Sequence, residues 1–244
     1  MTSSPFLSII LPAHNEAMRL PQTLEAISHY MADRDFESEL VIVENASSDS
    51  TLAIANHFAA DHPHCRVLTE PIAGKGNAVR TGMLAARGEL RFICDADLSM
   101  SIDQLDSFLP PCAEGYDIAI GSREAPGAER INEPPYRHFI GRVFNTMVRW
   151  LTLPGLQDTQ CGFKCFTAKA AEELFPLQTQ NGWTFDVEIL AIAMRKGYRV
   201  MEVPIRWQYF PGSKVHVFHD SFQMALDLIT IRRKLRRGEY DQSH

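Results

Sequence analysis

Two aspartates stand one residue apart directly after an apolar run: the segment FICDADLS, residues 92–99, contains Asp95 and Asp97. Side chains two positions apart in an extended segment point the same way, so the carboxylates would repel and raise each other's pKa unless a cation lay between them. Mg²⁺ and Mn²⁺ favour carboxylate oxygens and keep open positions for substrate phosphates. The pair therefore predicts a Mg²⁺ or Mn²⁺ site for a diphosphate, with a turn or helix cap as the alternative.

Polar residues follow other apolar runs in the same way. They are Pro12, His14, Asn15 and Glu16 after SIIL, Glu44 and Asn45 with Ser47, Ser48 and Asp49 after LVIV, and Gly121, Ser122 and Arg123 after DIAI. In open α/β sheets, ligands bind outside the carboxyl ends of the strands. Each group alone could form a turn or cap, and capping is the stronger interpretation of SSDST, but their shared position predicts one binding site.

The segment AGKGNAVR, residues 73–80, places glycines on both sides of Lys75 before a helical pattern. A loop of this kind at a helix N-terminus can hold an anion. The GxxxxGK[ST] and GxGxxG spacings are both missing, which weakens the ATPase and dinucleotide-binding hypotheses. Lys75 and Gly76 are therefore candidate substrate ligands, and a helix start with a surface lysine is an equally good alternative.

The elements that must position these residues alternate between β-rich and helical runs. Strands are expected at 7–11, 39–44, 65–70, 89–95 and 117–122, and helices at 16–31, 50–60, 75–86 and 101–109. This alternation predicts an α/β fold with a doubly wound, mostly parallel sheet. The Pro-rich residues 125–135 indicate a mobile loop. Beyond it, we expect a hydrophobic helix at 137–151, helices beginning near 168 and within 182–198, a strand at 199–207 and a final helix. This second half is α+β in character, and we interpret it as an acceptor region built onto a nucleotide-binding half.

The composition is typical of a soluble globular protein: 45% of the 244 residues are hydrophobic and 22% are charged. The net charge of −6 argues against a general nucleic-acid binder, although residues 232–237 contain a basic cluster. The five cysteines form no CxxC pair and no zinc spacing, so we expect reduced thiols. Without a basic leader or a bilayer-length apolar window, we expect a cytoplasmic protein that is at most peripheral on a membrane.

A series of motifs resembles a known enzyme family. SIILPAHNEA, VIVENASSDST, GKGNAVRTGM, DADLS, GSR, DTQCGFK, FDVEIL and GSK, in this order, resemble family 2 glycosyltransferases of the dolichyl-phosphate glucosyltransferase and mannosyltransferase type. PAHNE and DAD are shared across the family, whereas DTQCGFK followed by FDVE and GSK is distinctive of the polyprenyl-phosphate glucosyltransferase branch. The resemblance implies a GT-A (Rossmann-like) fold in one domain, 1–244, with a nucleotide-sugar-binding half at 1–124 and an acceptor-binding half at 125–244.

The same resemblance implies inverting transfer of a hexose to a polyprenyl or dolichyl phosphate at the cytoplasmic membrane face, with glucose from UDP-glucose preferred. A GDP-mannose-dependent mannosyltransferase, a transferase for a soluble or polysaccharide hydroxyl, and a non-catalytic nucleotide-sugar binder stay open, as does the oligomeric state. A dication on Asp95 and Asp97 would stabilise the charge on the departing diphosphate. A phosphate acceptor is already ionised near neutral pH and needs cations rather than a general base.

The resemblance also carries roles to single residues. Pro12, His14 and Glu16 would line the nucleotide, Glu44 would meet the base or ribose, and Ala96 lies within the DxD motif. Glu44 and Asn45 stand where the family usually has Asp-Asp, and His14 where it often has Tyr, which leaves base recognition open.

Arg123, Arg137 and Lys214 would hold donor or acceptor phosphates, for which the planar arginine fork is well suited. Asp158 could orient an arginine, bind a sugar hydroxyl or cap a turn. Asp186 opens a helix, where the dipole favours a carboxylate in any case. Both aspartates are included among the candidate catalytic residues.

Three further features have two interpretations each. Trp183 is expected in the core, with stacking on a sugar as the alternative. Residues 139–153 could form an interfacial helix that guides a lipid tail, or buried core. The last helix has Phe218, Phe222, Ala225, Leu226 and Ile229 at helical spacing. That pattern favours an amphipathic helix packed on the sheet, whereas the basic cluster after it favours attraction to an anionic bilayer.

Overall fold

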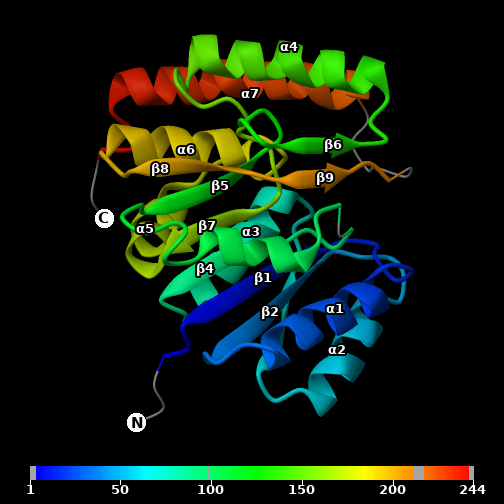
Figure 1. The fold of residues 1–244 in the computed structure, drawn as a ribbon. Helices are drawn as coiled ribbons and strands as arrows, with labels where there is room; N and C mark the ends of the chain where they lie inside the picture. The colour runs from blue at the N-terminus through cyan, green and yellow to red at the C-terminus, as the bar shows by residue number, and fades with distance from the viewer. Residues whose placement is uncertain (1–3, 98, 211–216, 242–244) are drawn as a thin grey trace.

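A seven-stranded sheet of order β3-β2-β1-β4-β7-β5-β8 forms the centre of the computed structural model, which describes residues 4–97, 99–210 and 217–241 (Figure 1). The strands are β1 (Leu7–Ala13), β2 (Ser38–Asn45), β3 (Cys65–Glu70), β4 (Leu90–Ile93), β5 (Ile118–Ser122), β7 (Lys164–Thr167) and β8 (Val200–Pro204). β7 runs antiparallel to its neighbours β4 and β5, and the other neighbouring pairs are parallel. The predicted α/β fold with a mostly parallel sheet is confirmed.

Helices cover both faces of the sheet. α1 (Leu20–Ala32), α2 (Thr51–Asp61) and the 3₁₀ helix η1 (Ile102–Phe108) share one core cluster with Leu7, Ile9 and Leu11 of β1. α3 (Lys75–Ala85), α5 (Ala168–Leu174), η2 (Phe175–Leu177) and α6 (Phe185–Arg195) share the other with Ile10. Strands buried on both faces are apolar at successive positions, which explains the continuous hydrophobic runs in the sequence.

Two further helices, α4 (Pro135–Leu151) and α7 (Val217–Arg237), form an outer layer beyond α6, side by side at the top of Figure 1. Between this layer and the sheet lies a parallel two-stranded ribbon of β6 (Glu129–Ile131) and β9 (Arg206–Gln208). Residues 125–135, predicted as a mobile loop, therefore contain a strand, because the distant residues 206–208 supply its partner.

Several element boundaries differ from the prediction. α1 begins at Leu20 rather than near 16, with Pro21 in its first turn, where a missing N–H breaks no helical hydrogen bond. The strand expected at 199–207 divides into β8 and β9. β7 was not predicted, and it inserts residues of the C-terminal half between two strands of the N-terminal half. The two proposed halves thus share one sheet, and the boundary between them stays a prediction.

Two predictions on the chain's environment can be compared with the fold. Within the described ranges, no helix combines the length and the apolar character that crossing a bilayer requires. All five cysteines are free thiols, as predicted. Burial raises the pKa of Cys161 and Cys165 to about 12, and both side chains belong to a buried core cluster.

Candidate active site

A cavity opens at the carboxyl ends of β1, β4 and β5, where the predicted polar clusters converge. It brings together most of the predicted site residues: Pro12, His14, Asn15, Glu16, Asn45, Lys75, Asp95, Ala96, Asp97, Arg123 and Asp186. Helices α4 and α7 form the facing wall through Ile140, Phe144 and Met224. The cavity thus has a charged floor on the sheet and an apolar wall on the outer helices.

Asp95 and Asp97 lie in a turn after β4. Oδ1 of Asp97 accepts the N–H of Ser99 at 3.0 Å, so this aspartate also has the turn-forming role that the sequence left as an alternative. Burial, and then the neighbouring Asp95 carboxylate, raise the pKa of Asp97, and the Ser99 hydrogen bonds and then the Lys75 ammonium oppose that shift. A cation between the carboxylates would relieve this repulsion.

The donor set fits Mg²⁺ or Mn²⁺. The described residues contain no group of three or more His, Cys, Asp or Glu arranged to hold a metal ion. Two carboxylates without further protein ligands leave positions for water and for diphosphate oxygens, which is how Mg²⁺ is usually bound. The site thus suits an ion that arrives with a phosphorylated substrate.

Gly162 lies directly against Asp95. A Cβ atom at position 162 would be 1.8 Å from Oδ2 of Asp95, so no other residue fits there without moving the carboxylate. Gly162 belongs to the motif DTQCGFK, which leads into β7. The unpredicted central strand is therefore what brings this motif to the carboxylate pair.

The glycines beside Lys75 have a packing role. A Cβ at Gly74 would be 2.4 Å from the carbonyl oxygen of Asn181, and one at Gly76 would be 2.5 Å from that of Gln180. Gly76 is buried by this contact and does not line the cavity. Lys75, between them, points into the cavity, and its Nζ lies 2.7 Å from Oδ1 of Asp95.

Arg123 is held by Asp158. Nε and Nη2 of Arg123 donate to the two carboxylate oxygens of Asp158, at 2.6 and 2.9 Å. Burial alone would raise the pKa of Asp158, but the guanidinium outweighs it and lowers that pKa to about 2. Asp158 is fully buried behind Arg123 and does not line the cavity. Its position matches the predicted arginine-orienting role, because a bidentate pair fixes the plane of the guanidinium.

Asp186 reaches the cavity from the start of α6, where it pairs with a buried lysine. Nζ of Lys164 lies 2.8 Å from Oδ1 of Asp186 and also donates to the carbonyl oxygen of Cys161. Burial raises the pKa of Asp186, and Lys164 and then Lys75 oppose that shift. Lys164 lies on β7, so the strand that sequence patterns missed also supplies the partner of Asp186.

The loops after β1 and β2 are joined by hydrogen bonds. Nδ1 of His14 is 2.5 Å from the carbonyl oxygen of Asn45, and the N–H of Asn15 donates to Oγ of Ser47 at 3.0 Å. Glu44 is 4% exposed, and its Oε1 accepts the N–H of Ser47 at 2.5 Å. Glu44 and Ser47 are not among the residues that line the cavity, and the role of Glu44 at a base or ribose stays a prediction.

Three further residues singled out in the sequence are Arg137, Lys214 and Trp183. Lys214 lies outside the described residues, and Arg137 is in the first turn of α4 with a side chain that lies outside them. Trp183, expected in the core, is half-buried and lines the cavity. It stands beside Lys75, whose Nζ is 5.5 Å from the centre of the Trp183 ring.

Comparison with known proteins shows the family to which this chain belongs. The profile described as "Glycosyl transferase family 2" matches residues 8–175, which include the Asp95 turn, Lys75, Arg123 and Gly162. The chain belongs to glycosyl transferase family 2. The resemblance inferred from the motifs is thereby confirmed.

Curated relatives of this family 2 glycosyltransferase share most of its length. Dolichyl-phosphate beta-glucosyltransferases are 36% identical in Trichomonas vaginalis, 33% in Saccharomyces cerevisiae and 31% in Homo sapiens. The matches cover 97, 96 and 96% of this chain and 73, 76 and 77% of the relatives, respectively.

Solved structures of glucosyl-3-phosphoglycerate synthase from Mycobacterium tuberculosis share the fold. The complex with Mn²⁺, UDP and glucosyl-3-phosphoglycerate has a TM-score of 0.69 at 16% identity, covering 93% of this chain and 80% of that one. The complex with Mg²⁺ and UDP has a TM-score of 0.66 at 18% identity, covering 93 and 78%. This likeness confirms the GT-A-like fold.

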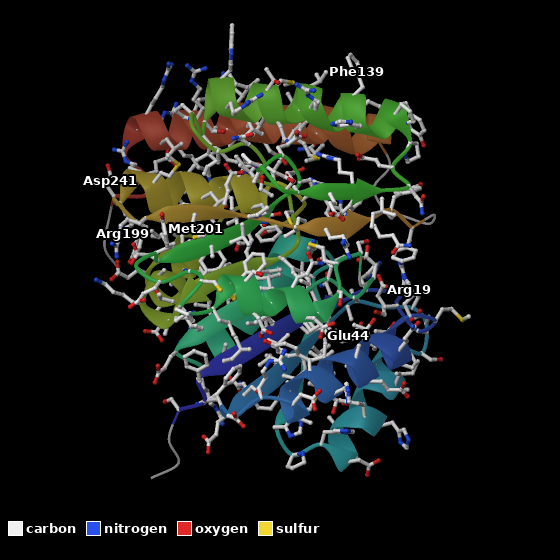
Figure 2. The ribbon with its side chains drawn as sticks, viewed as in Figure 1. Arg19, Glu44, Phe139, Arg199, Met201 and Asp241 are labelled. Carbon is white, nitrogen blue, oxygen red and sulfur yellow. The ribbon has the colours of Figure 1, made fainter. Side chains whose placement is uncertain are left out.

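The family 2 glycosyltransferase has two cavity arginines that the motifs did not indicate. Arg19 pairs with Glu16 at 2.9 Å, and Arg130 pairs with Glu124 and Glu133 at 2.7 and 2.6 Å. Arg19 lies just before α1, as Figure 2 shows, and Arg130 lies on β6. Arg130 had no signal in the sequence because the strand that carries it depends on β9.

Asp158→Asn is expected to lower the free energy of unfolding of the glycosyltransferase by about 3 kcal/mol at neutral pH, because it leaves the buried part of Arg123 without its counter-charge. The folded-state pKa of Asp158 lies below the usual value. The contribution of the ionised Asp158 to the free energy of unfolding is therefore complete above about pH 4 and is lost as the pH falls through about 2. Urea unfolding of both proteins from pH 7 down to acid measures this, and the difference should shrink over that window.

Asp61→Asn, at the exposed end of α2, is the matched control and should change stability by less than about 0.5 kcal/mol. A difference between wild type and Asp158→Asn that stays constant down to pH 2 would show that the ion pair with Arg123 does not stabilise the fold.

Proposed function

We propose that this glycosyltransferase moves glucose from UDP-glucose to a dolichyl or other polyprenyl phosphate, with Mg²⁺ or Mn²⁺ held by Asp95 and Asp97. The observation that carries the proposal is the cavity itself, which combines a carboxylate pair with the buttressed Arg123 and an apolar wall. Relatives at 31–36% identity that are named dolichyl-phosphate beta-glucosyltransferases support the choice of donor and acceptor.

The residues divide the chemistry between them. Asp95 and Asp97 would hold the ion, and the chemistry that an ion supplies there is neutralisation of the charge growing on the departing diphosphate. Arg123, fixed by Asp158, would offer its remaining N–H groups to a phosphate oxygen. An ionised phosphate acceptor is itself the nucleophile and needs no general base. A single displacement then inverts the configuration at the anomeric carbon.

Labelled UDP-glucose incubated with a short polyprenyl phosphate and Mn²⁺ tests this function. We expect a product that partitions into organic solvent and releases its label in mild acid. Equal or better turnover with GDP-mannose would show that UDP-glucose is not the preferred donor. Transfer confined to a water-soluble hydroxyl acceptor, or binding without turnover of any donor, would reject the proposal.

We further propose that the enzyme contacts a membrane through the outer face of α4 and the end of α7, here called the α4–α7 face. Phe139 and Trp150 of α4 are 70 and 85% exposed, with Tyr136 and Val143 on the same stripe of the helix. Figure 2 shows Phe139 directed away from the rest of the fold. The adjoining side of α4 lines the cavity through Ile140 and Phe144, so the same helix borders both the active site and this apolar stripe.

Basic residues border the stripe and make it complementary to an anionic bilayer. Arg142 and Arg149 of α4 are exposed, and so are Arg233, Arg236 and Arg237 of α7. Each basic residue near such a surface contributes about 1 kcal/mol of attraction. Docking here would place the cavity next to the bilayer from which a lipid phosphate must come.

Phe139→Ser combined with Trp150→Ser is expected to weaken binding to vesicles containing anionic phosphatidylglycerol at least tenfold, because the stripe loses its two most exposed rings. Vesicle sedimentation measures this. Leu52→Ser combined with Leu84→Ser removes two exposed leucines from α2 and α3 and should leave binding unchanged. Equal losses in the two double variants, or none in the first, would exclude the α4–α7 face as the contact.

A further inference from the structure

Lys75 is enclosed by acidic groups of the candidate metal site. Its Nζ is 2.7 Å from Oδ1 of Asp95, and its side chain is 18% exposed. Burial disfavours the charged form, yet Asp95, Asp186 and Asp97 together hold the pKa of Lys75 above its usual value. The ammonium group is therefore in direct contact with one of the two carboxylates that are expected to receive a dication.

The backbone of Lys75 is fixed, and its side chain lines the cavity. Oδ1 of Asn45 accepts the N–H of Gly74 at 2.8 Å, and the N–H of Asn77 donates to the carbonyl oxygen of Asn181 at 3.3 Å. The packing of Gly74 and Gly76 against residues 180–181 adds to this restraint. A four-carbon side chain on a fixed backbone can exchange one anion for another within a few ångströms.

Asp95 has little capacity left for a metal ion while this ion pair persists. Its Oδ2 lies against Gly162, where an added Cβ would be 1.8 Å away, and its Oδ1 faces Lys75. An ammonium and a dication beside the same oxygen repel each other strongly in a partly buried site. A metal ion can therefore bind Asp95 with full strength only if Lys75 moves.

We propose that Lys75 is a counter-ion of Asp95 that disfavours a dication arriving alone and moves to the donor diphosphate when metal and nucleotide arrive together. The inference rests on the proposed metal site and gives Lys75 a positioning role in it. The consequence is coupled binding, in which nucleotide and metal each raise the affinity of the other.

Mn²⁺ binding to the full chain without nucleotide, followed by the electron paramagnetic resonance signal of free Mn²⁺, tests the inference. Lys75→Met and Lys75→Gln should each bind Mn²⁺ alone about tenfold more tightly than wild type, because the competing cation is gone. The same variants should bind UDP in the presence of Mn²⁺ about tenfold more weakly, because a phosphate contact is lost. Lys75→Arg, which keeps the charge, should retain weak binding of Mn²⁺ alone.

Lys169→Met, on the exposed side of α5, removes the same charge far from the cavity and should bind Mn²⁺ as wild type does. Two neutral replacements guard against a folding defect in one of them. Unchanged or weaker binding of Mn²⁺ alone in the folded Lys75 variants overturns the inference, as does an equal gain in Lys169→Met. If wild type binds no Mn²⁺ even with UDP present, the metal site of the proposed function fails, and this inference fails with it.

Discussion

Replacing Asp97 with asparagine is expected to reduce glucose transfer from UDP-glucose about a thousandfold while the protein stays folded. Asparagine keeps the size of the side chain and an oxygen that can accept the N–H of Ser99, so the turn after β4 should persist. It removes one of the two charges that would hold the metal ion. Loss of about 4 kcal/mol of transition-state stabilisation corresponds to a thousandfold in rate.

The measurement is the initial rate of organic-extractable label, with thermal unfolding as the check on folding. Asp103→Asn, an exposed aspartate on η1, is the matched control and should keep full activity. Asp97→Asn retaining more than a tenth of the wild-type rate would show that Asp97 is not a metal ligand needed for transfer.

Gly162→Ala is the second change with a large expected effect. The new Cβ would occupy the space of the Asp95 carboxylate, 1.8 Å from Oδ2, so either Asp95 must rotate or β7 must shift. Displacement of a positioned group by about 1 Å can cost a hundredfold in rate. We therefore expect glucose transfer to fall about a hundredfold and Mn²⁺ binding in the presence of UDP to weaken.

Gly182→Ala offers a matched comparison at the same cavity. A Cβ there meets no atom within 4 Å, and its backbone does not need a positive φ, so this variant should keep at least half of the wild-type rate. Similar rates in Gly162→Ala and wild type would mean that Asp95 tolerates displacement and is not clamped against β7 for catalysis.

The sequence alone was sufficient to predict the parts of the site that follow single strands. Asp95, Asp97 and Arg123 come directly after apolar runs, and parallel strands bring such ends together at one edge of the sheet. This is why the cavity contains most of the residues that the motifs singled out.

What sequence patterns missed depends on contacts between distant segments. β7 has four residues and gains its place from β4 and β5 on either side, so its register, and with it Gly162 and Lys164, is not encoded locally. The inward direction of Glu44 and the ion pair between Lys75 and Asp95 likewise arise only when the loops after β1, β2 and β4 pack together.

The central claim is that a dication held by Asp95 and Asp97 neutralises the departing nucleotide. It is tested most directly by measuring transfer from labelled UDP-glucose to a polyprenyl phosphate after all divalent ions have been chelated and again after Mn²⁺ has been restored. We predict that product formation falls to background with chelator and returns with Mn²⁺. An undiminished rate in the chelated enzyme would contradict the account.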